Sequence, residues 1–466
     1  MSDGPPARAV SFCAAGGYGR DPAGGRRIAA VAGPVAGNSA GKRRSATVPT
    51  DDSESMSASA AASGLAPIPV HERLLALDAL RGLALLGIFL SNAEMFNRPL
   101  ADISDGIDAH LRGLDHAASA LVYVLIRSKF WTLFSLLFGM SFAVMFERSR
   151  QAGRDFRPLY LRRSVGLLII GLIHAWLIWA GDILVTYALA AFGLFAMRSL
   201  SPGALWRIGL SLYLSVLGFF LMIAALLAIP GVAQSTPADA AADRAARAAE
   251  IAAYAHGDYA QATAQRLAFF ADGAMSGWFS MVPMVLGLFL IGAWFVRSGA
   301  LADPAAHRRR LRALIGFGVP AGAAITGLSL FIDSSPAFTP VSAASVAAST
   351  LHMLGALPLA MALIAWVVLV VHGGARWPLR FAPAGRMALS NYLAQSLIGT
   401  LAFYGYGFGL WGRVPLAALI AAAFAVFALQ MLLSALWLRH YRFGPVEWLW
   451  RAFTYWRLPP MRIRVS

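Results

Sequence analysis

Charged residues are scarce in this sequence. Only 13% of its 466 residues are Asp, Glu, Lys or Arg, whereas 58% are apolar. The mean hydropathy is +0.62, while soluble globular proteins have about 25% charged and about 45–50% apolar residues. This balance is typical of a polytopic membrane protein. We therefore expect an all-α fold whose helices span a lipid bilayer.

Cysteine is nearly absent as well. Cys13 stands alone, which excludes an internal disulfide framework and any thiolate metal cage. The sequence also has no P-loop, no HExxH and no GxSxG, so it argues against ATP-driven pumping and soluble-type serine hydrolysis. His110 and His116 follow several aspartates, but their spacing matches no known ligand set. We expect no metal and no bound cofactor.

Basic residues outnumber acidic ones, and the formal net charge is +16. The arginines stand in short clusters between apolar runs, where they flank a bilayer rather than line a groove. This distribution excludes nucleic acid as the expected partner.

The first seventy residues differ from the rest. They are rich in Ala, Gly, Ser, Pro and Arg and contain no apolar run long enough for a signal peptide. We expect a disordered cytoplasmic tail over 1–70 and a transmembrane domain over 71–466. Met56 is the expected true start of the protein.

Runs of about 17–25 apolar residues predict membrane-spanning helices. The second such run contains Arg127 and Lys129, so its first half is expected to be a separate interfacial or re-entrant piece. About ten spans are predicted, at 74–92, 118–146, 164–180, 182–198, 206–229, 277–297, 311–332, 345–371, 386–405 and 414–438.

The connections between these spans alternate in charge. Arginines cluster in 147–163, 297–312 and 372–386, whereas 91–116 and 231–276 lack such clusters. Because short basic loops stay in the cytoplasm, both termini are expected to be cytoplasmic.

The C-terminal stretch "FGPVEWLWRAFTYWRLPP" predicts a short interfacial helix over 444–456. Pro445 suits a first helical turn, and Glu447 and Arg451 stand four residues apart, where they can pair. Tryptophan is common at the level of the lipid headgroups.

The first span carries an acid, a base and an amide. Asp78 and Arg81 are i, i+3 neighbours and can pair, and Asn92, eleven residues after Arg81, falls on nearly the same helix face. The simpler interpretation is that the pair anchors the helix by snorkelling. An aligned polar stripe is more than an anchor needs, however, because ionisable groups inside a membrane commonly mark functional sites.

The third and fourth spans hold His174 and Asp182. Asp182 can cap the helix that follows it. A histidine inside an apolar helix needs a partner or water, so His174 is either a structural residue bonded to a neighbouring carbonyl or a group that handles protons.

The last two spans carry rows of polar residues. Asn391 and Gln395 stand at i, i+4 beside Tyr392, and Gln430 and Ser434 form a similar row. Such rows hydrogen-bond helices to one another in membranes, which we favour for the last span. The first row is also a candidate substrate-binding set.

Several motifs together resemble the YeiB-like family of bacterial membrane proteins. They include "RLLALDALRGLALLGIFLSN", "KFWTLFSLLFGMSFA", "YLRRSVGLLIIGLIHAWLIWAGDILVTYALA", "GRMALSNYLAQSLIGTLAFYGYGFGLWG" and "GPVEWLWRAFTYW". The resemblance runs from about residue 70 to the C-terminus, and 277–466 resembles the family's C-terminal domain of unknown function, number 418. It implies a multi-pass protein of the bacterial inner membrane.

That family is similar to a wider group of membrane acyltransferases, which includes heparan-alpha-glucosaminide N-acetyltransferase. The latter has an "LDxxRGxxL…N" first helix, which Asp78, Arg81, Gly82 and Asn92 match here. Sugar-modifying members have histidine about where Asn92 stands. The resemblance implies an acyl donor such as acetyl-CoA on the cytoplasmic side and a sugar, lipid or small-molecule acceptor on the far side.

The glucosaminide enzyme uses a histidine in the outer loop after its first helix. By position, the resemblance implies His116 as the nearest counterpart here, with His110 second.

These observations lead to a hypothesis of acyl transfer. Arg81, together with the cytoplasmic basic loops, would hold the anionic donor, and His116 or His174 would deprotonate the acceptor. Asn92 would orient the acceptor or stabilise the oxyanion, and Asp182 would fix a histidine tautomer.

The other candidate substrate-binding residues are Asp78, Asn391, Tyr392 and Gln395. The alternative is a proton-coupled transporter or exporter of a small molecule, with His174 and Asp182 as a proton relay. The sequence indicates no particular oligomeric state.

Overall fold

The structure is a computed structural model that describes residues 70–103, 106–232, 236–336 and 341–463. Within this part of the chain the secondary structure is helical, and the one extended pairing is an isolated bridge between Tyr441 and Arg462. The expected tail up to residue 69, with the expected start at Met56, lies outside the described residues.

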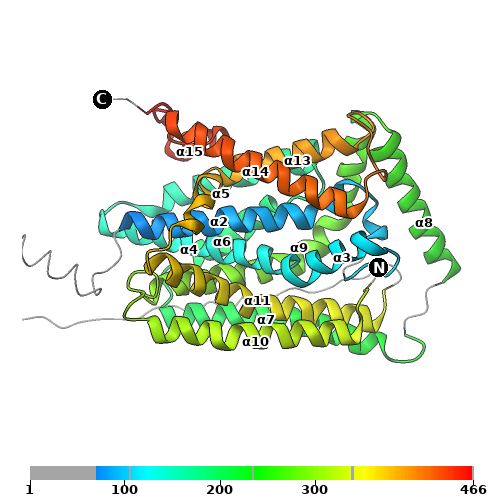
Figure 1. The fold of residues 1–466 in the computed structure, drawn as a ribbon, viewed down its shortest axis with the longest axis horizontal. Coiled ribbons are helices and arrows are strands. Elements are labelled where there is room, and N and C mark those ends of the chain that lie inside the picture. Colours follow the sequence, from blue (N-terminus) through cyan, green and yellow to red (C-terminus); the bar gives the residue numbers. More distant parts are fainter. Residues whose placement is uncertain (1–69, 104–105, 233–235, 337–340, 464–466) are drawn as a thin grey trace, which may run out of the picture. The chain divides into compact units, whose positions relative to one another are not determined.

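In the described part of the chain, eight helical segments are long and apolar enough to cross a membrane, which confirms the prediction of an all-α, polytopic membrane protein. Long and short together, the α-helices of the described part are α2 (Val70–Ala93), α3 (Gly113–Leu121), α4 (Lys129–Gln151), α5 (Phe156–Ile173), α6 (Leu184–Ala196), α7 (Pro202–Leu227), α8 (Pro237–Ile251), α9 (Tyr259–Arg297), α10 (Arg308–Ile332), α11 (Ala343–His372), α12 (Ala382–Arg386), α13 (Ala388–Phe403), α14 (Leu416–His440) and α15 (Pro445–Tyr455) (Figure 1).

Two of the ten predicted spans are short helices. The span at 182–198 becomes the 13-residue α6, and the span at 386–405 becomes the 16-residue α13. At about 1.5 Å per residue, neither reaches the roughly 30 Å of a hydrocarbon core. The crossing of all ten segments stays a prediction.

The second predicted span is broken where its two basic residues stand. A π-helical turn, Val122–Ile126, follows α3, and α4 begins only at Lys129. Ser128, between them, has φ 64°, in the left-handed region that no helix continues through. The predicted division of this span is therefore confirmed.

The connections between helices gather at two ends of the described part. At one end, which we name the α8 end, Ile107 N donates to Ser334 O at 2.7 Å and Gly405 N donates to Tyr254 O at 2.8 Å. At the other, the α15 end, Arg297 Nη1 donates to Leu200 O at 2.6 Å. The three arginine-rich connections, 147–163, 297–312 and 372–386, lie at the α15 end, as the alternation of loop charge predicts (Figure 1). Which end faces the cytoplasm stays a prediction.

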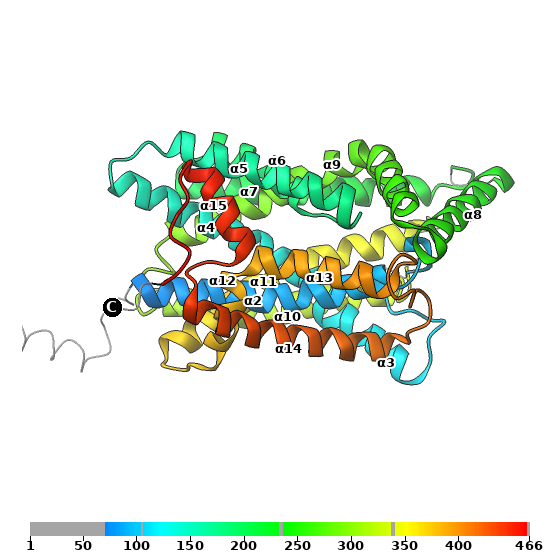
Figure 2. The same cartoon turned by 90° about the horizontal axis from the view of Figure 1, so that it is seen from above.

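Helix α2 packs closely against α12, and Figure 2 shows the two lying side by side. The contact depends on two glycines, because a Cβ added at Gly385 would lie 1.8 Å from Asp78 O and one at Gly82 would lie 2.1 Å from Phe381 O. Small residues allow such backbone contact between membrane helices. The contact fixes the position of the first-helix ion pair.

The C-terminal helix forms as predicted, but its acid has another partner. Instead of pairing with Arg451, Glu447 accepts hydrogen bonds from Leu389 N at 2.7 Å and Ser390 N at 3.0 Å. The first N–H groups of a helix have no partner within it, and the first turn of α13 begins at Ala388. A buried carboxylate is therefore better satisfied there than beside an arginine.

Candidate functional site

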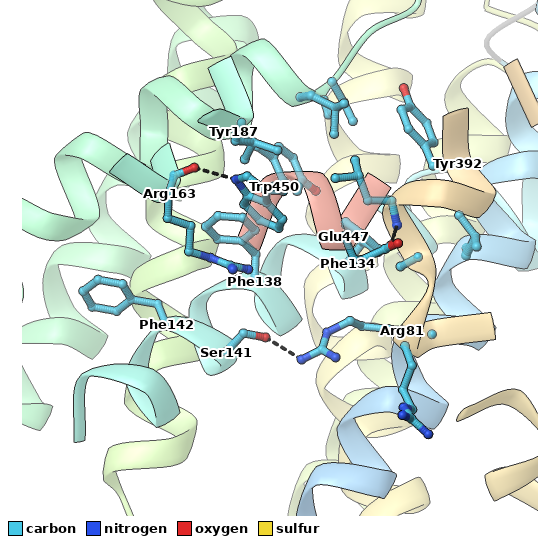
Figure 3. A pocket seen from close by; sticks show the side chains of 18 of the residues that line it. Arg81, Phe134, Phe138, Ser141, Phe142, Arg163, Tyr187, Tyr392, Glu447 and Trp450 are labelled. Carbon is cyan, nitrogen blue, oxygen red and sulfur yellow. Dashed lines mark hydrogen bonds between the residues drawn. The ribbon is translucent and has the colours of Figure 1, made fainter. Parts of the chain in front are cut away.

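A cavity of about 250 Å³ opens among α2, α4, α5, α6, α12, α13 and α15. Figure 3 shows its polar side chains and its aromatic wall. Four of its lining residues are arginines that come from four different helices, and the aromatic wall comes mainly from α4. The arginines are Arg81, Arg163, Arg386 and Arg451, and the α4 aromatic residues are Phe134, Phe138 and Phe142.

The first-helix pair stands at this cavity. Arg81 bonds to Asp78 within α2 and donates from Nη2 to Ser141 Oγ of α4 at 2.8 Å. The predicted pairing is therefore confirmed. Because one guanidinium bridges two helices, its direction is fixed, and one edge of the group lies along the cavity wall (Figure 3).

A second arginine of the cavity contacts an aromatic ring. The guanidinium carbon of Arg163 lies 3.7 Å from the ring centre of Trp450, within the range of a cation–π contact. Trp450 Nε1 in turn donates to Arg163 O at 2.8 Å. Helix α15 is thus attached to α5 by both the backbone and the side chain of one residue.

Glu447 is the acid among the residues that line this cavity. Both of its oxygens accept hydrogen bonds at the start of α13, from Leu389 N and from the amide and hydroxyl of Ser390. Burial raises the pKa of the Glu447 carboxyl, against the effect of those bonds. The Glu447 carboxyl is thus bonded to the start of α13 and not to an arginine. With four arginines and one acid in its lining, the cavity has an excess of positive charge that suits an anion.

His174 and Asp182 form a buried pair. His174 Nδ1 lies 2.7 Å from Asp182 Oδ1, and Asp182 Oδ2 accepts from Val185 N at 2.8 Å. The predicted capping role of Asp182 is confirmed, and the same side chain also holds the histidine. Because a carboxylate accepts the Nδ1 proton, the neutral imidazole has its lone pair on Nε2.

The other nitrogen of this histidine has no partner. His174 is 0% exposed, and its Nε2 makes no hydrogen bond within the described part of the chain. Buried polar atoms are rarely left without one. An unpartnered acceptor on a tautomer fixed by a carboxylate is the arrangement that a general base needs.

The pair lies directly behind the cavity wall. Ile183, Leu184 and Tyr392 line the cavity, and the Tyr392 ring centre is 5.1 Å from that of His174. Leu184 begins the helix that Asp182 caps. The histidine is therefore separated from the cavity by one layer of side chains.

A smaller cavity, of about 80 Å³, lies on the other side of the same hairpin. Its walls include Trp179, Ala180 and Gly181, together with Glu250 of α8. Tyr392 Oη donates to Gly181 O at 3.5 Å. The 179–184 hairpin, which carries Asp182, thus separates a cavity at the α15 end from one at the α8 end.

Two predicted residues lie away from both cavities. His116 is exposed on α3, with Nδ1 3.2 Å from Asp108 O. Asn92 is half-buried near the end of α2 and lines neither cavity. The structure does not bring Asn92 together with Arg81, because the two residues stand eleven positions apart, about 16 Å along the helix axis.

The polar row of α13 divides between two roles. Asn391 Nδ2 donates to Ser434 Oγ at 3.0 Å, and Gln395 Nε2 donates to Gln430 Oε1 at 2.8 Å. These amides tie α13 to α14, which confirms the helix-pairing interpretation of the row on the last span. Asn391 and Gln395 line neither cavity, whereas Tyr392, about 100° further round the helix, faces the larger one.

The sequence predicts that the basic loops help to hold an anionic donor, but it does not single out three arginines of the cavity. They are Arg163, Arg386 and Arg451, which stand in or beside the basic connections. Their presence there is already explained by the rule that positively charged loops stay in the cytoplasm. The sequence feature that could have indicated such a site is the adjacent pair Trp450 and Arg451 in the C-terminal helix. Among the described residues, no three His, Cys, Asp or Glu side chains gather as a metal site.

Known proteins with similar sequences align with most of this chain. The family described as a protein of unknown function (DUF418) matches residues 295–457. The uncharacterized protein YxaH of Bacillus subtilis (strain 168) is 34% identical over 86% of this chain and 98% of its own length. The uncharacterized protein YeiB of Escherichia coli (strain K12) is 31% identical over 82% of this chain and 96% of its own length.

The matched region ends just after α15 and includes the arginine and tryptophan of that helix that line the larger cavity. With relatives aligned over nearly their whole length, the chain belongs to the YeiB-like family of DUF418 membrane proteins.

Proposed function

We propose that this protein is a membrane-bound acyltransferase. The donor is an acyl-CoA such as acetyl-CoA, bound in the larger cavity from the α15 end, which is cytoplasmic in the predicted orientation. The acceptor is a hydroxyl or amine that reaches the hairpin from the α8 end. One observation carries the proposal: a carboxylate-held histidine with an unpartnered nitrogen lies between two cavities.

The larger cavity suits part of such a donor. Pockets that enclose a drug-sized ligand measure roughly 300–1,000 Å³, so a cavity of about 250 Å³ holds only a segment of acyl-CoA. We assign the acyl-pantetheine arm to the apolar wall formed by Phe134 and Phe138. The phosphates would then contact Arg163, Arg386 and Arg451 at the α15 end. One guanidinium group can donate two parallel hydrogen bonds to two oxygens of a phosphate.

The reaction follows from the histidine pair. His174 Nε2 takes the proton of the acceptor O–H or N–H while the acceptor atom attacks the thioester carbonyl carbon. The C–S bond then breaks, and the thiolate leaves with the proton that the imidazolium returns. Asp182 stabilises the imidazolium through Nδ1. The products are an ester or amide and the free CoA thiol.

Tyr392 is the side chain that links the pair to the donor cavity. Its ring contacts His174 and lines the cavity, so its displacement would open a path from Nε2 to the thioester. Asn391 and Gln395 hold the helix that carries Tyr392, and in this proposal they position the site without binding substrate. The base is His174 rather than His116.

Calorimetry with acetyl-CoA on the full chain in nanodiscs tests the donor site. Arg81→Ala and Arg386→Gln should each raise the Kd at least tenfold, because each removes one charge from the cavity. Arg386 makes a single long hydrogen bond of 3.4 Å, to Arg442 O, so its variant should keep the fold even if Arg81→Ala does not.

The matched control is Arg112→Ala, which removes an exposed arginine at the α8 end and should leave the Kd unchanged. His174→Gln should bind acetyl-CoA like the wild type but transfer no radiolabelled acetyl group to a total membrane extract. Release of the CoA thiol can be followed directly, since Cys13 is the protein's single cysteine.

A folded wild type that neither binds acetyl-CoA nor releases CoA would overturn the proposal. Flux of a small molecule that depends on a proton gradient, without covalent change, would instead support the transporter alternative.

A further inference from the structure

A fully buried arginine stands near the histidine pair. Arg266 of α9 is 0% exposed, and within the described part of the chain it forms no ion pair with a carboxylate. Its Nε donates to Trp176 O at 3.0 Å and its Nη2 donates to Thr263 Oγ1 at 2.6 Å, while Nη1 has no partner there. A buried charge without a counter-ion is costly unless other groups compensate it.

The compensating group is the end of a helix. Trp176 belongs to the π-helical turn His174–Ile178 that ends α5, where backbone carbonyls lack intrahelical donors and carry partial negative charge. Tyr259 Oη donates to the next carbonyl, Leu177 O, at 2.8 Å. The first half of α9 therefore caps the turn that begins with His174.

The geometry of that turn determines where the imidazole points. A π-helical turn contains one residue more than an α-helical turn, and such turns are frequent at functional sites. The turn is closed by a hydrogen bond from Trp179 N to His174 O at 2.9 Å. The donors to the carbonyls of Trp176 and Leu177 oppose relaxation of this turn to a regular helix. Such relaxation would rotate His174 away from Asp182.

We propose that Arg266 is a positioning residue for His174. It holds the π-helical turn through the carbonyl of Trp176, so that Nδ1 stays on Asp182 and Nε2 stays available to a proton. Arg266 lines neither cavity, so it contacts neither donor nor acceptor. This role rests on the proposed acyl transfer, although the geometry of the turn can be measured without it.

The test compares Arg266→Gln, Arg266→Lys and Tyr259→Phe in the full chain in nanodiscs. Deuterium exchange at C2 of His174, followed by mass spectrometry, reports the environment of this ring. It should accelerate at least threefold in Arg266→Gln and less in Arg266→Lys, which keeps the charge. Acetyl transfer should fall at least tenfold in Arg266→Gln, while the Kd for acetyl-CoA stays within twofold of the wild-type value.

The matched control is Arg244→Gln, which removes an exposed arginine of α8 and should change none of these quantities. A parallel loss of acetyl-CoA binding, transfer and melting temperature in Arg266→Gln would indicate a purely structural residue and overturn the inference. Unchanged exchange at His174 would also overturn it. If Arg266→Gln does not fold, Arg266→Lys tests the guanidinium itself, and Tyr259→Phe tests whether donors from α9 hold the turn, because it removes the neighbouring bond to Leu177 O. Unchanged exchange at His174 in both variants would overturn the inference.

If the wild type transfers no acetyl group, the proposed function fails, but the exchange at His174 still decides whether Arg266 holds the turn.

Discussion

Glu447 shows how one side chain can organise a site without adding its charge to it. Its carboxylate satisfies the first amides of α13, and its helix brings Trp450 and Arg451 to the cavity. The arginines therefore keep their excess of positive charge. Asp182 works in the same way, because it caps a helix with one oxygen and holds His174 with the other.

The stability of the protein should depend on pH through Glu447. Burial raises its pKa above the ordinary value of 4.5, so the folded protein holds this proton more tightly than the unfolded chain. The stabilisation is present at low pH and is lost as the pH rises through the raised pKa. Glu447→Gln does not titrate. The melting temperature of this variant, relative to that of the wild type, should therefore rise with pH. Tryptophan fluorescence during thermal unfolding would measure both melting temperatures.

Asp239→Asn provides a control of opposite sign. Hydrogen bonds from the Thr236 backbone and side chain lower the pKa of Asp239 at the start of α8, so this variant should lose stability relative to the wild type as the pH rises. The same trend in both variants would contradict the assignment.

Pairs that lie close in sequence could be predicted, and sites assembled from distant helices could not. Asp78 with Arg81 and His174 with Asp182 are separated by three and eight residues, so helix geometry and a tight hairpin suffice to predict them. The cavity joins Arg81 to Arg451, and nothing in a single span tells which other helix it faces. His116 was inferred from a resemblance by position, and its predicted role stays untested.

At the scale of elements, the contact between α2 and α12 determines where the first-helix pair stands. The two backbones touch at Gly82 and Gly385, and Asp78 O lies at the point of contact. Hydropathy predicts that such helices exist but not that their backbones touch. Likewise, it predicts a span at 386–405 without the break at Met387, where φ is −111° and ψ is 31°.

Gly385→Ala should disturb both the fold and donor binding. The new methyl group would lie 1.8 Å from Asp78 O, so α12 must move away, at a cost of about 1–3 kcal/mol by analogy with overpacked cores. We expect a lower melting temperature and weaker acetyl-CoA binding, since Arg81 and Arg386 move apart. Thermal unfolding and calorimetry would measure the two effects.

Gly218→Ala is the matched control, because no atom lies within 4 Å of the added Cβ and alanine favours a helix by about 1 kcal/mol over glycine. Equal melting temperatures for the two variants would show that the α2–α12 contact is looser than described.

At the scale of the molecule, the alternation of connections follows from the sequence, and their grouping at two ends follows from the structure. Hydrogen bonds link segments as distant as residues 97 and 412 at the α8 end. The assignment of these ends to the two sides of a membrane depends on the distribution of base, which labelling can test.

In a Cys13→Ser background the chain contains no cysteine, so single cysteines can be added at exposed positions. Ala109→Cys, at the α8 end, should react with a membrane-impermeant maleimide in intact spheroplasts. Ala306→Cys, at the α15 end, should react only after permeabilisation. Both positions are exposed. The reverse result would place the arginine-lined cavity outside the cell and exclude a cytoplasmic acyl-CoA donor.

The thinness of the 179–184 hairpin has an electrical consequence. When water fills two cavities that approach each other from opposite sides of a membrane, most of the membrane potential falls across the wall between them. A full elementary charge crossing that wall gains or loses about 2.3 kcal/mol per 100 mV. In the predicted orientation, a charge that passes this hairpin from one cavity to the other would therefore cross much of the membrane potential within a few residues.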